Sequence, residues 1–187
     1  MKLQGFAATI RSEIRAEPTD MQPAQNQSRI SFQTIGVIRT PHRRQAGTPI
    51  QPYAAKDAAG EIEIFAPFRP SLQDLQGFDR IWVLYWLHQA KPYTPRVIPY
   101  WDVVERGLFA TRAPNRPNPI GLSPVRLLEI NADSGLLRVL DVDMLDGTPL
   151  LDIKPYVPKF DCYPEAKAGW LDEKNKGRDF ADERFES

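Results

Sequence analysis

The sequence contains very few residues of the kinds that form disulfides or hold metal ions. Among its 187 residues there is a single cysteine, Cys162, and there are only two histidines, His42 and His88. A lone cysteine cannot form a disulfide within the chain, which favours the reducing environment of the cytoplasm. Because zinc sites draw mainly on cysteine and histidine, we also expect no metal site.

Long apolar runs are absent as well. The first 30 residues mix arginine, glutamate, glutamine and proline, and they lack the apolar stretch of a secretory signal. No segment approaches the roughly 20 apolar residues of a membrane-spanning helix. There is no G-x-G-x-x-G fingerprint, so we do not expect a Rossmann cleft. These absences predict a cytoplasmic protein with no membrane association.

The formal net charge is zero, but the charges are unevenly distributed. Residues 1–30 carry 4 basic and 3 acidic groups, residues 31–130 carry 12 and 8, and residues 131–187 carry 8 and 13. A protein that coats nucleic acid without regard to sequence would normally be more basic overall. A local basic patch within residues 31–130 is still compatible with an RNA partner.

Short strands dominate the pattern of apolar residues. Strand-like segments lie at 30–38, 61–65, 81–87, 125–130 and 136–145. The continuous apolar run at 81–87 predicts a strand covered on both faces. With 18 prolines and little helical periodicity, the chain is expected to be all-β or β-dominated, with a single β-barrel domain and few short helices.

The expected domain organisation has three parts. Residues 1–29 have weak periodicity and predict a flexible leader. The barrel domain is expected over residues 30–164, with one short helix that starts at Ser71 as its N-cap and ends before Gly77. Residues 165–187 predict a charged C-terminal tail with some helix.

The segment "FATRAPNRPNPIGLSPVR" (109–126) is the most unusual in the chain. It contains four prolines, and no acidic residue occurs between Arg106 and Arg126. Each proline fixes its own φ and pushes the preceding residue toward extended geometry, so the loop has little entropy left to lose on binding. Its arginine side chains are suited to carboxylates and phosphates. The alternative is a proline-rich turn whose arginines brace neighbouring carbonyls.

Four segments together resemble one family. "FATRAPNRPNPIGLSPVRL", "LHQ" (87–89), "TPIQP" (48–52) and "DGTPLLDIKPYVP" (146–158) are similar to the TrmO/TsaA-like (YaeB) proteins, and the resemblance covers about residues 31–160. These proteins are S-adenosylmethionine-dependent methyltransferases of a β-barrel type. The resemblance implies methyl transfer to the exocyclic nitrogen of threonylcarbamoyl-adenosine beside the tRNA anticodon. It also implies a homodimer with cofactor pockets near the subunit interface.

The resemblance also implies which residues contact S-adenosylmethionine. On matching positions these are Pro49, Ile50, Gln51, His88, Gln89, Arg112, Leu122, Asp146, Gly147, Thr148 and Pro149. The rigid basic loop and the Asp-Gly turn agree with this assignment from their own residues, although an Asp-Gly pair alone is also typical of a plain hairpin turn. Gln51 and Leu122 rest on the resemblance alone.

Candidate catalytic residues lie in "DIKPY" (152–156). An acid, a proline and an aromatic in this order resemble the short motif of methyltransferases that act on nucleobase amines. Asp152, or the backbone near Lys154, could accept the hydrogens of the amine, while Tyr156 would stack on the base. We expect tRNA to contact Arg43, Arg44 and Arg116.

Two other functions fit the same sequence. One is a non-catalytic β-barrel that binds RNA or the cofactor alone. The other is a methyltransferase of a small metabolite, because the better-known members of the family carry a further domain after the barrel and this chain ends about 30 residues after "DIKPYVP".

Overall fold

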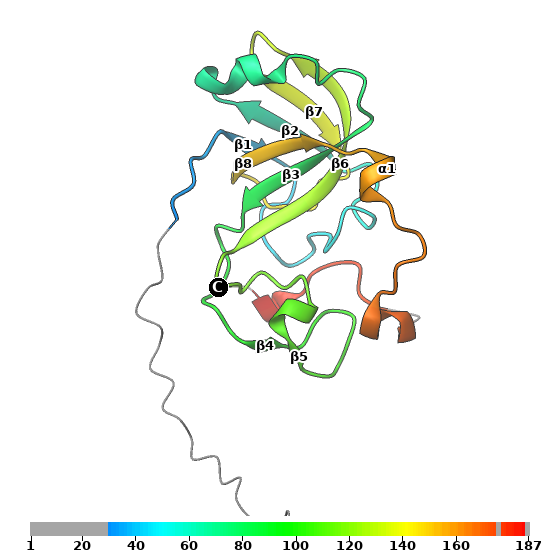
Figure 1. Cartoon of the computed structure of the whole chain (residues 1–187). Coiled ribbons are helices and arrows are strands. Elements are labelled where there is room, and N and C mark those ends of the chain that lie inside the picture. Colours follow the sequence, from blue (N-terminus) through cyan, green and yellow to red (C-terminus); the bar gives the residue numbers. More distant parts are fainter. Residues whose placement is uncertain (1–29, 175–176, 186–187) are drawn as a thin grey trace, which may run out of the picture. The chain divides into compact units, whose positions relative to one another are not determined.

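The main body of the protein is a closed antiparallel β-barrel. The computed structural model describes residues 30–174 and 177–185, so the expected leader at 1–29 lies outside the described residues. Within the described part, six strands close in the order β1-β2-β7-β6-β3-β8 (Figure 1). They are β1 (Gly36–Arg39), β2 (Ala59–Ile64), β3 (Arg80–Trp86), β6 (Ile120–Asn131), β7 (Leu136–Leu140) and β8 (Thr148–Pro155). The predicted β-dominated barrel is confirmed.

The remaining elements are short. Two further strands pair with each other, β4 (Arg96–Val97) and β5 (Arg106–Gly107). The helical turns are η1 (Ala66–Leu72), η2 (Leu108–Ala110), α1 (Pro158–Asp161), η3 (Gly169–Glu173) and η4 (Glu183–Phe185). None of the helices in the described part is long and apolar enough to cross a membrane.

The barrel interior is filled by alternate residues of each strand. On β3, Ile81, Val83 and Tyr85 are buried, whereas the intervening residues are half-buried and Trp86 is exposed. The expectation that both faces of 81–87 are covered is therefore wrong. A closed barrel has one enclosed side, so the outer face of an apolar strand is covered only where loops cross it.

The segment 136–145 is a strand only in its first half. β7 ends at Leu140 because Asp141 adopts a left-handed conformation, with φ of 69°. The Asp141 carboxylate accepts hydrogen bonds from Arg80, Arg126 and the backbone N–H of Asp57. These three contacts hold Asp141 in a conformation that non-glycine residues rarely adopt.

The predicted helix with Ser71 as its N-cap is wrong. A 3-10 helix runs over Ala66–Leu72 instead, so Ser71 lies inside the helix, near its C-terminal end. Pro67 occupies the first turn and Pro70 lies inside the helix. Proline fits the first turn of a helix but interrupts its interior, which explains a short helix that begins earlier than expected.

The charged C-terminal segment packs back onto the loops below the barrel. Phe185 joins Val97, Leu108 and Ala113 in a second apolar cluster, separate from the barrel core. Residues 179–181 form backbone hydrogen bonds with 47–50, and Phe180 forms a β-bridge with Pro49. Some helix was expected in 165–187. In the described part of this segment, the helical elements are short 3-10 helices at Gly169–Glu173 and Glu183–Phe185.

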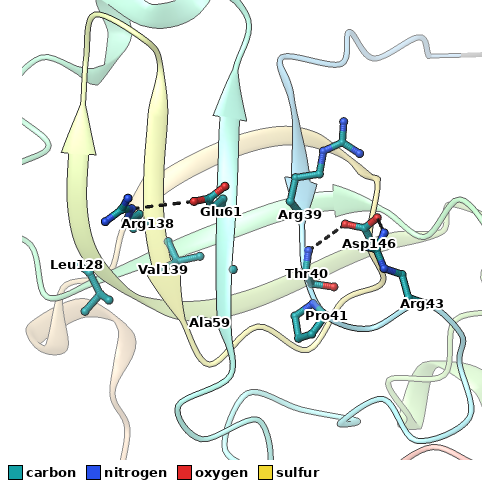
Figure 2. Close-up of a pocket in the computed structure, with 11 residues that line it drawn as sticks. Arg39, Thr40, Pro41, Arg43, Ala59, Glu61, Leu128, Arg138, Val139 and Asp146 are labelled. Carbon is teal, nitrogen blue, oxygen red and sulfur yellow. Dashed lines mark hydrogen bonds and ion pairs between the residues drawn. The ribbon is translucent and has the colours of Figure 1, made fainter.

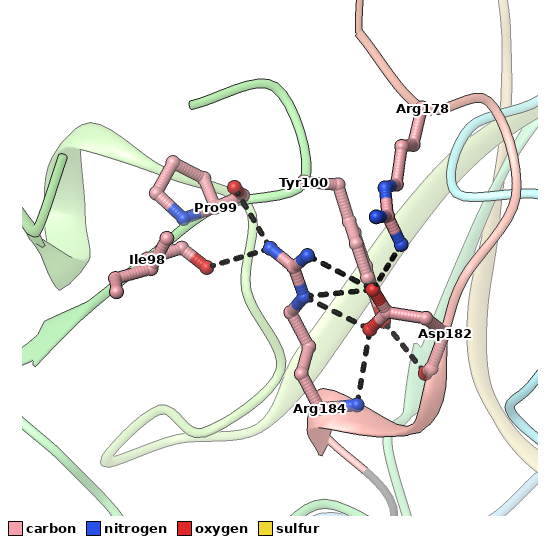
Figure 3. A network of polar contacts seen from close by, with 6 residues as sticks. All are labelled: Ile98, Pro99, Tyr100, Arg178, Asp182 and Arg184. Atoms are coloured by element: carbon pink, nitrogen blue, oxygen red, sulfur yellow. Dashed lines mark hydrogen bonds and ion pairs between the residues drawn. The ribbon is translucent and has the colours of Figure 1, made fainter. Parts of the chain in front are cut away.

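Asp182 organises the end of this segment (Figure 3). Arg184 donates to both of its carboxylate oxygens, and Arg178 pairs with it from the other side. The same Arg184 guanidinium also donates to the carbonyls of Ile98 and Pro99, at 3.4 and 3.1 Å. Asp182 and Arg184 thus tie the C-terminal segment to the loop that precedes Tyr100.

Asp102 forms a second tie between the same two segments. Its side chain is 1% exposed and pairs with Arg106 at 2.6 Å and with Lys174 at 3.0 Å. The hydrogen bonds from Arg106 and Lys174, together with those from two backbone N–H groups, hold the pKa of the Asp102 carboxyl well below its usual range.

We expect acid to loosen the C-terminal segment before the barrel. A carboxyl with a depressed folded-state pKa stabilises the fold above its unfolded pKa, near 4, and this contribution is lost as the pH falls further. The protection of residues 177–185 against hydrogen exchange, measured relative to the intrinsic exchange rate at each pH, should therefore fall below about pH 4, and Asp102→Asn should show the same loss of protection at pH 7. If these amides were equally protected in the wild type and in Asp102→Asn at pH 7, Asp102 would not be what holds the C-terminal segment in place.

Candidate functional site

The proline-rich segment before β6, residues 109–119, is called the rigid loop. It contacts the loop between β1 and β2 through Arg112. The guanidinium of Arg112 donates a hydrogen bond to the side-chain oxygen of Gln51. Pro49 is buried against Phe180, and the N–H of Ile50 donates to the carbonyl of Asp179 at 2.9 Å. The predicted residues 49–51 are thus held from one side by the C-terminal segment and from the other by Arg112.

The turn before β8 is closed by its own polar groups. Gly147 has φ of 76°, a conformation that favours glycine, and Thr148 donates from its hydroxyl to the carbonyl of Leu145 at 2.7 Å. The Asp146 carboxylate accepts hydrogen bonds from the N–H of Thr40, at 3.1 Å, and from Arg43. Asp146, predicted as a cofactor residue, is therefore paired with Arg43, predicted as an RNA residue.

His88 and Gln89 follow directly after β3. Their side chains lie within hydrogen-bond distance of each other, at 3.3 Å, and the Gln89 carbonyl accepts from the side chain of Gln45 at 3.1 Å. The ring of His88 lies edge-on to Trp86.

The loop at residues 40–58 joins all of these elements. It contacts the 146–149 turn through Arg43, the end of β3 through Gln45, and the rigid loop through Gln51. In the strand register, Ile38 pairs with Thr148, and Trp86 pairs with Ile120. The ends of β1 and β3 and the starts of β6 and β8 therefore lie at the same end of the barrel. We call this end, with its loops, the loop end.

Leu122 is separated from these contacts. It lies on the outer face of β6 opposite Leu84, and it is 51% exposed. No hydrogen bond or ion pair in the described part of the chain links it to Arg112 or to the 146–149 turn.

The three predicted catalytic residues lie together on the outside of the barrel. Asp152 and Lys154 of β8 form an exposed ion pair at 2.6 Å. The ring of Tyr156 packs against Trp82, with centroids 5.5 Å apart. Among the residues that the structure describes, none of these contacts reaches the predicted cofactor residues.

The sequence reasoning missed a polar chain at the loop end, in which Tyr85 and Ser123 are buried and Asp143 is half-buried. The hydroxyl of Ser123 donates to the Asp143 carboxylate at 2.6 Å, and the Tyr85 hydroxyl lies 3.0 Å from the same Ser123 oxygen. Burial raises the pKa of the Asp143 carboxyl to about 7, although the Ser123 hydrogen bond and the charge of Arg112 act in the opposite direction. Burial also raises the pKa of Tyr85 above its usual range.

The available sequence signal for Asp143 was ambiguous. The alternation in 136–145 places Asp141 and Asp143 on the face opposite the apolar residues. Because the strand ends at Leu140, the two carboxylates instead have different environments: Asp141 pairs with two arginines and Asp143 with a serine. Periodicity alone could not detect this.

The arginines predicted to bind RNA differ in how far they are already engaged. Arg116 donates to the carbonyls of Thr111 and Ala113 and lies over the ring of Phe109, so it braces the rigid loop itself. Arg44 is exposed, and no carboxylate in the described residues pairs with it.

A groove of about 640 Å³ runs along the outside of β1, β2 and β7 and ends at Asp146 (Figure 2). Arg39, Arg43 and Arg138 supply its positive charge. Arg138 pairs with Glu61 at 4.0 Å and with Glu129 at 3.3 Å. No ion pair to Arg39 occurs among the described residues, so its charge is available within the groove.

The chain matches the family model of the tRNA-methyltransferase O N-terminal domain over residues 37–162. It is 49% identical over 146 residues to a probable S-adenosyl-L-methionine-binding protein of Pyrococcus abyssi, covering 78% of each chain. It is 38% identical over 151 residues to the tRNA (adenine(37)-N6)-methyltransferase of Escherichia coli, covering 76% of this chain and 64% of that protein.

Solved structures agree with these matches. The crystal structure of TrmO from Pseudomonas aeruginosa superposes with a TM-score of 0.64 at 38% identity, covering 76% of this chain and 63% of that one. The chain therefore spans somewhat under two thirds of the Escherichia coli and Pseudomonas aeruginosa proteins. The family model, the sequence identities and the fold agree: the chain belongs to the family of the tRNA-methyltransferase O N-terminal domain.

Proposed function

We propose that this protein is an S-adenosylmethionine-dependent methyltransferase that acts on the exocyclic amine of threonylcarbamoyl-adenosine beside the tRNA anticodon. The observation that supports it most is the convergence of the 49–51, 88–89, 112 and 146–149 segments at one end of a barrel. The relatives named as S-adenosylmethionine-binding proteins and as a tRNA (adenine(37)-N6)-methyltransferase support the same activity. We place it in the cytoplasm.

The chemistry of the loop end fits S-adenosylmethionine. The methionine part of this molecule carries a carboxylate. The exposed guanidinium of Arg112 can bind it, because the hydrogen-bond partner of this side chain among the described residues is the neutral amide of Gln51. Its amino groups need acceptors, and the side-chain oxygen of Asn115 is a buried acceptor with no donor among the described residues. The residues proposed to hold the cofactor remain those of the family pattern, with Arg112 as the main anchor.

The bound cofactor supplies a methyl group on a positively charged sulfur, which needs only a nucleophile aligned with the carbon–sulfur bond. The protein's contribution is therefore mainly to position the two reactants. Pro114 and Pro117 on either side of Arg116 keep the rigid loop in place with little entropic cost on binding. Asp152, Lys154 and Tyr156 remain candidate contacts to the nucleobase; their mutual packing on the outer face makes them a surface on which a base could stack.

The groove of Figure 2 is the surface that we propose for the RNA backbone. Its lining includes Asp146, which belongs to the proposed cofactor turn, and Arg39, whose charge no described carboxylate neutralises. Arg44 lies exposed on the same loop as Arg43. Few phosphates would be neutralised, so binding is expected to be modest and to weaken with salt.

Charge reversal at Arg39 and Arg44 should reduce tRNA binding but not cofactor binding. Arg43 is unsuitable for this test because it holds Asp146, and its loss would disturb the cofactor turn as well. The Arg39→Glu, Arg44→Glu variant should raise the Kd for tRNA at least tenfold and leave the calorimetric Kd for S-adenosylmethionine within about twofold. Unchanged tRNA affinity would remove the groove from the RNA surface.

We also propose that the protein is a homodimer. Trp86, Ile120 and Leu122 are exposed apolar residues on adjoining strands, at the loop end of the outer barrel face. Within its own subunit, Leu122 is separated from the other proposed cofactor residues. A partner subunit packed on this face would let Leu122 take part in a cofactor pocket that both subunits form. Sedimentation equilibrium of the purified protein measures this directly, and a monomer at micromolar concentration would contradict it.

Transfer of a labelled methyl group from S-adenosylmethionine tests the function against its alternatives. Incorporation into tRNA supports the proposal. Incorporation only into small adenine compounds would favour a metabolite methyltransferase, and cofactor binding without any transfer would favour a non-catalytic binding protein.

A further inference from the structure

Methylation of an exocyclic amine releases a proton, and the loop end contains one carboxyl group suited to receive it. As the nitrogen–carbon bond forms, the electrons of the carbon–sulfur bond remain on sulfur and the amine loses one proton. Three carboxylates at or near the loop end are candidate acceptors. Asp146 is already paired with Arg43, and Asp152 with Lys154 in an exposed ion pair. Among the described residues, no cation forms an ion pair with Asp143.

Asp143 lies among the proposed cofactor residues. Its partner Ser123 is adjacent to Leu122 in β6, and Tyr85 occupies the position opposite Gly121 in β3. Asp143 itself precedes the Asp146 turn, and the charge of Arg112 is close enough to affect it. Four separate segments therefore converge on this carboxylate.

From this placement we infer that Asp143 accepts the proton released by the amine, and that Ser123 and Tyr85 hold its carboxylate in position. The inference rests on the proposed function. The Ser123 hydroxyl fixes one carboxylate oxygen at 2.6 Å and is itself in contact with the Tyr85 hydroxyl at 3.0 Å. No other side chain in the described part of the chain donates to Asp143, and the residue is only half-buried. Besides Ser123, the backbone N–H of Asp143 itself donates to the carboxylate. A carboxylate has lone pairs for further hydrogen bonds, so the group can still receive a proton and later release it to water.

The electrostatics suit this role. The titratable and charged groups that affect Asp143 are Tyr85 from β3 and Arg112 from the rigid loop; Ser123 from β6 adds a neutral hydroxyl. Burial outweighs the effects of Arg112 and Ser123 and raises the carboxyl pKa to about 7. A base with a pKa near the working pH is ionised often enough to act and is strong enough to take the proton.

The first experiment needs no activity. Carbon-13 NMR of the protein without ligand should show an aspartate carboxyl that titrates near pH 7 and disappears in Asp143→Asn. Between about pH 4 and pH 7 the Asp143 carboxyl is ionised in the unfolded chain but still protonated in the folded protein. The free energy of unfolding of the wild type, relative to that of Asp143→Asn, should therefore fall as the pH rises through this range. A pKa of about 4 for the Asp143 carboxyl would overturn the inference.

The second experiment follows methyl transfer against pH. The wild-type rate should rise with pH and level off above about pH 7, and Asp143→Asn should lower kcat by about 100-fold or more and remove this rise. Ser123→Ala removes a hydrogen bond that lowers the carboxyl pKa, so the inflection should move to higher pH. Glu63→Gln, which changes an exposed carboxylate of β2, is the matched control and should behave as the wild type.

The outcomes separate the inference from the proposed function. An active wild type whose pH profile is unchanged by Asp143→Asn, or is abolished by Asp152→Asn instead, would overturn the role of Asp143. A wild type that transfers no methyl group would overturn the proposed function.

Discussion

Replacing Gly121 by alanine is expected to abolish methyl transfer and to destabilise the barrel. A Cβ atom at this position would lie 2.1 Å from Cε2 and 2.3 Å from Cζ of the Tyr85 ring. Tyr85 is buried, so its ring cannot swing into solvent. It would have to move away from Gly121, and its hydroxyl would leave Ser123.

Two costs add in this variant. Overpacking a core typically costs about 1–3 kcal/mol. Leaving the buried hydroxyl of Tyr85 without its partner costs about 1–3 kcal/mol more. Denaturant unfolding should therefore show a loss of about 2–6 kcal/mol. The kcat should fall because Ser123, which positions the Asp143 carboxylate, loses its contact with Tyr85.

Gly107→Ala is the matched control for this substitution. An added Cβ at Gly107 meets nothing within 4 Å, and its φ of −58° is open to any residue. Its stability should be unchanged or slightly raised, because alanine restricts the unfolded chain. If the two variants unfolded alike, the packing of Tyr85 over Gly121 would not be the cause.

The sequence predicts the barrel well because its strands carry local signals. The alternation in 61–65 and the apolar run in 81–87 correspond to β2 and β3, within a residue or two at each end. The errors occur where a tertiary contact decides the conformation. Asp141 ends β7 early because distant arginines hold its carboxylate, and no local pattern contains that information.

The candidate site was predictable only where its residues form compact motifs. The proline-rich loop and the Asp-Gly turn are recognisable in short segments, and the structure links the first of them to Gln51 through Arg112. Asp143 is different, because its significance depends on a serine and a tyrosine from two other strands and on burial. The tie between Asp102 and Lys174 is likewise a product of folding.

Arg112→Ala should weaken S-adenosylmethionine binding more than any other single arginine replacement. Its guanidinium is exposed, and among the described residues its side-chain hydrogen-bond partner is the neutral amide of Gln51. A charge-assisted hydrogen bond to a ligand carboxylate contributes about 1.5–3 kcal/mol, which corresponds to a loss of roughly 10- to 100-fold in affinity. Calorimetry with the purified variant measures this change.

Arg96→Ala serves as the control for Arg112. Arg96 forms an exposed ion pair with Glu105, at 3.0 Å, and its removal should leave the cofactor Kd unchanged. Equal affinities for wild type and Arg112→Ala would mean that this arginine only supports the rigid loop. Equal losses in both variants would point to a general effect of charge.

The most direct test of the account is to identify the methylated nucleoside. The purified protein would be incubated with S-adenosylmethionine carrying a deuterated methyl group and with tRNA from cells that lack this modification, and the digested nucleosides would be analysed by mass spectrometry. We predict a mass increase of one deuterated methyl group on threonylcarbamoyl-adenosine and on no other nucleoside. Label on a different nucleoside, or none in tRNA under conditions where the cofactor binds, would contradict the account.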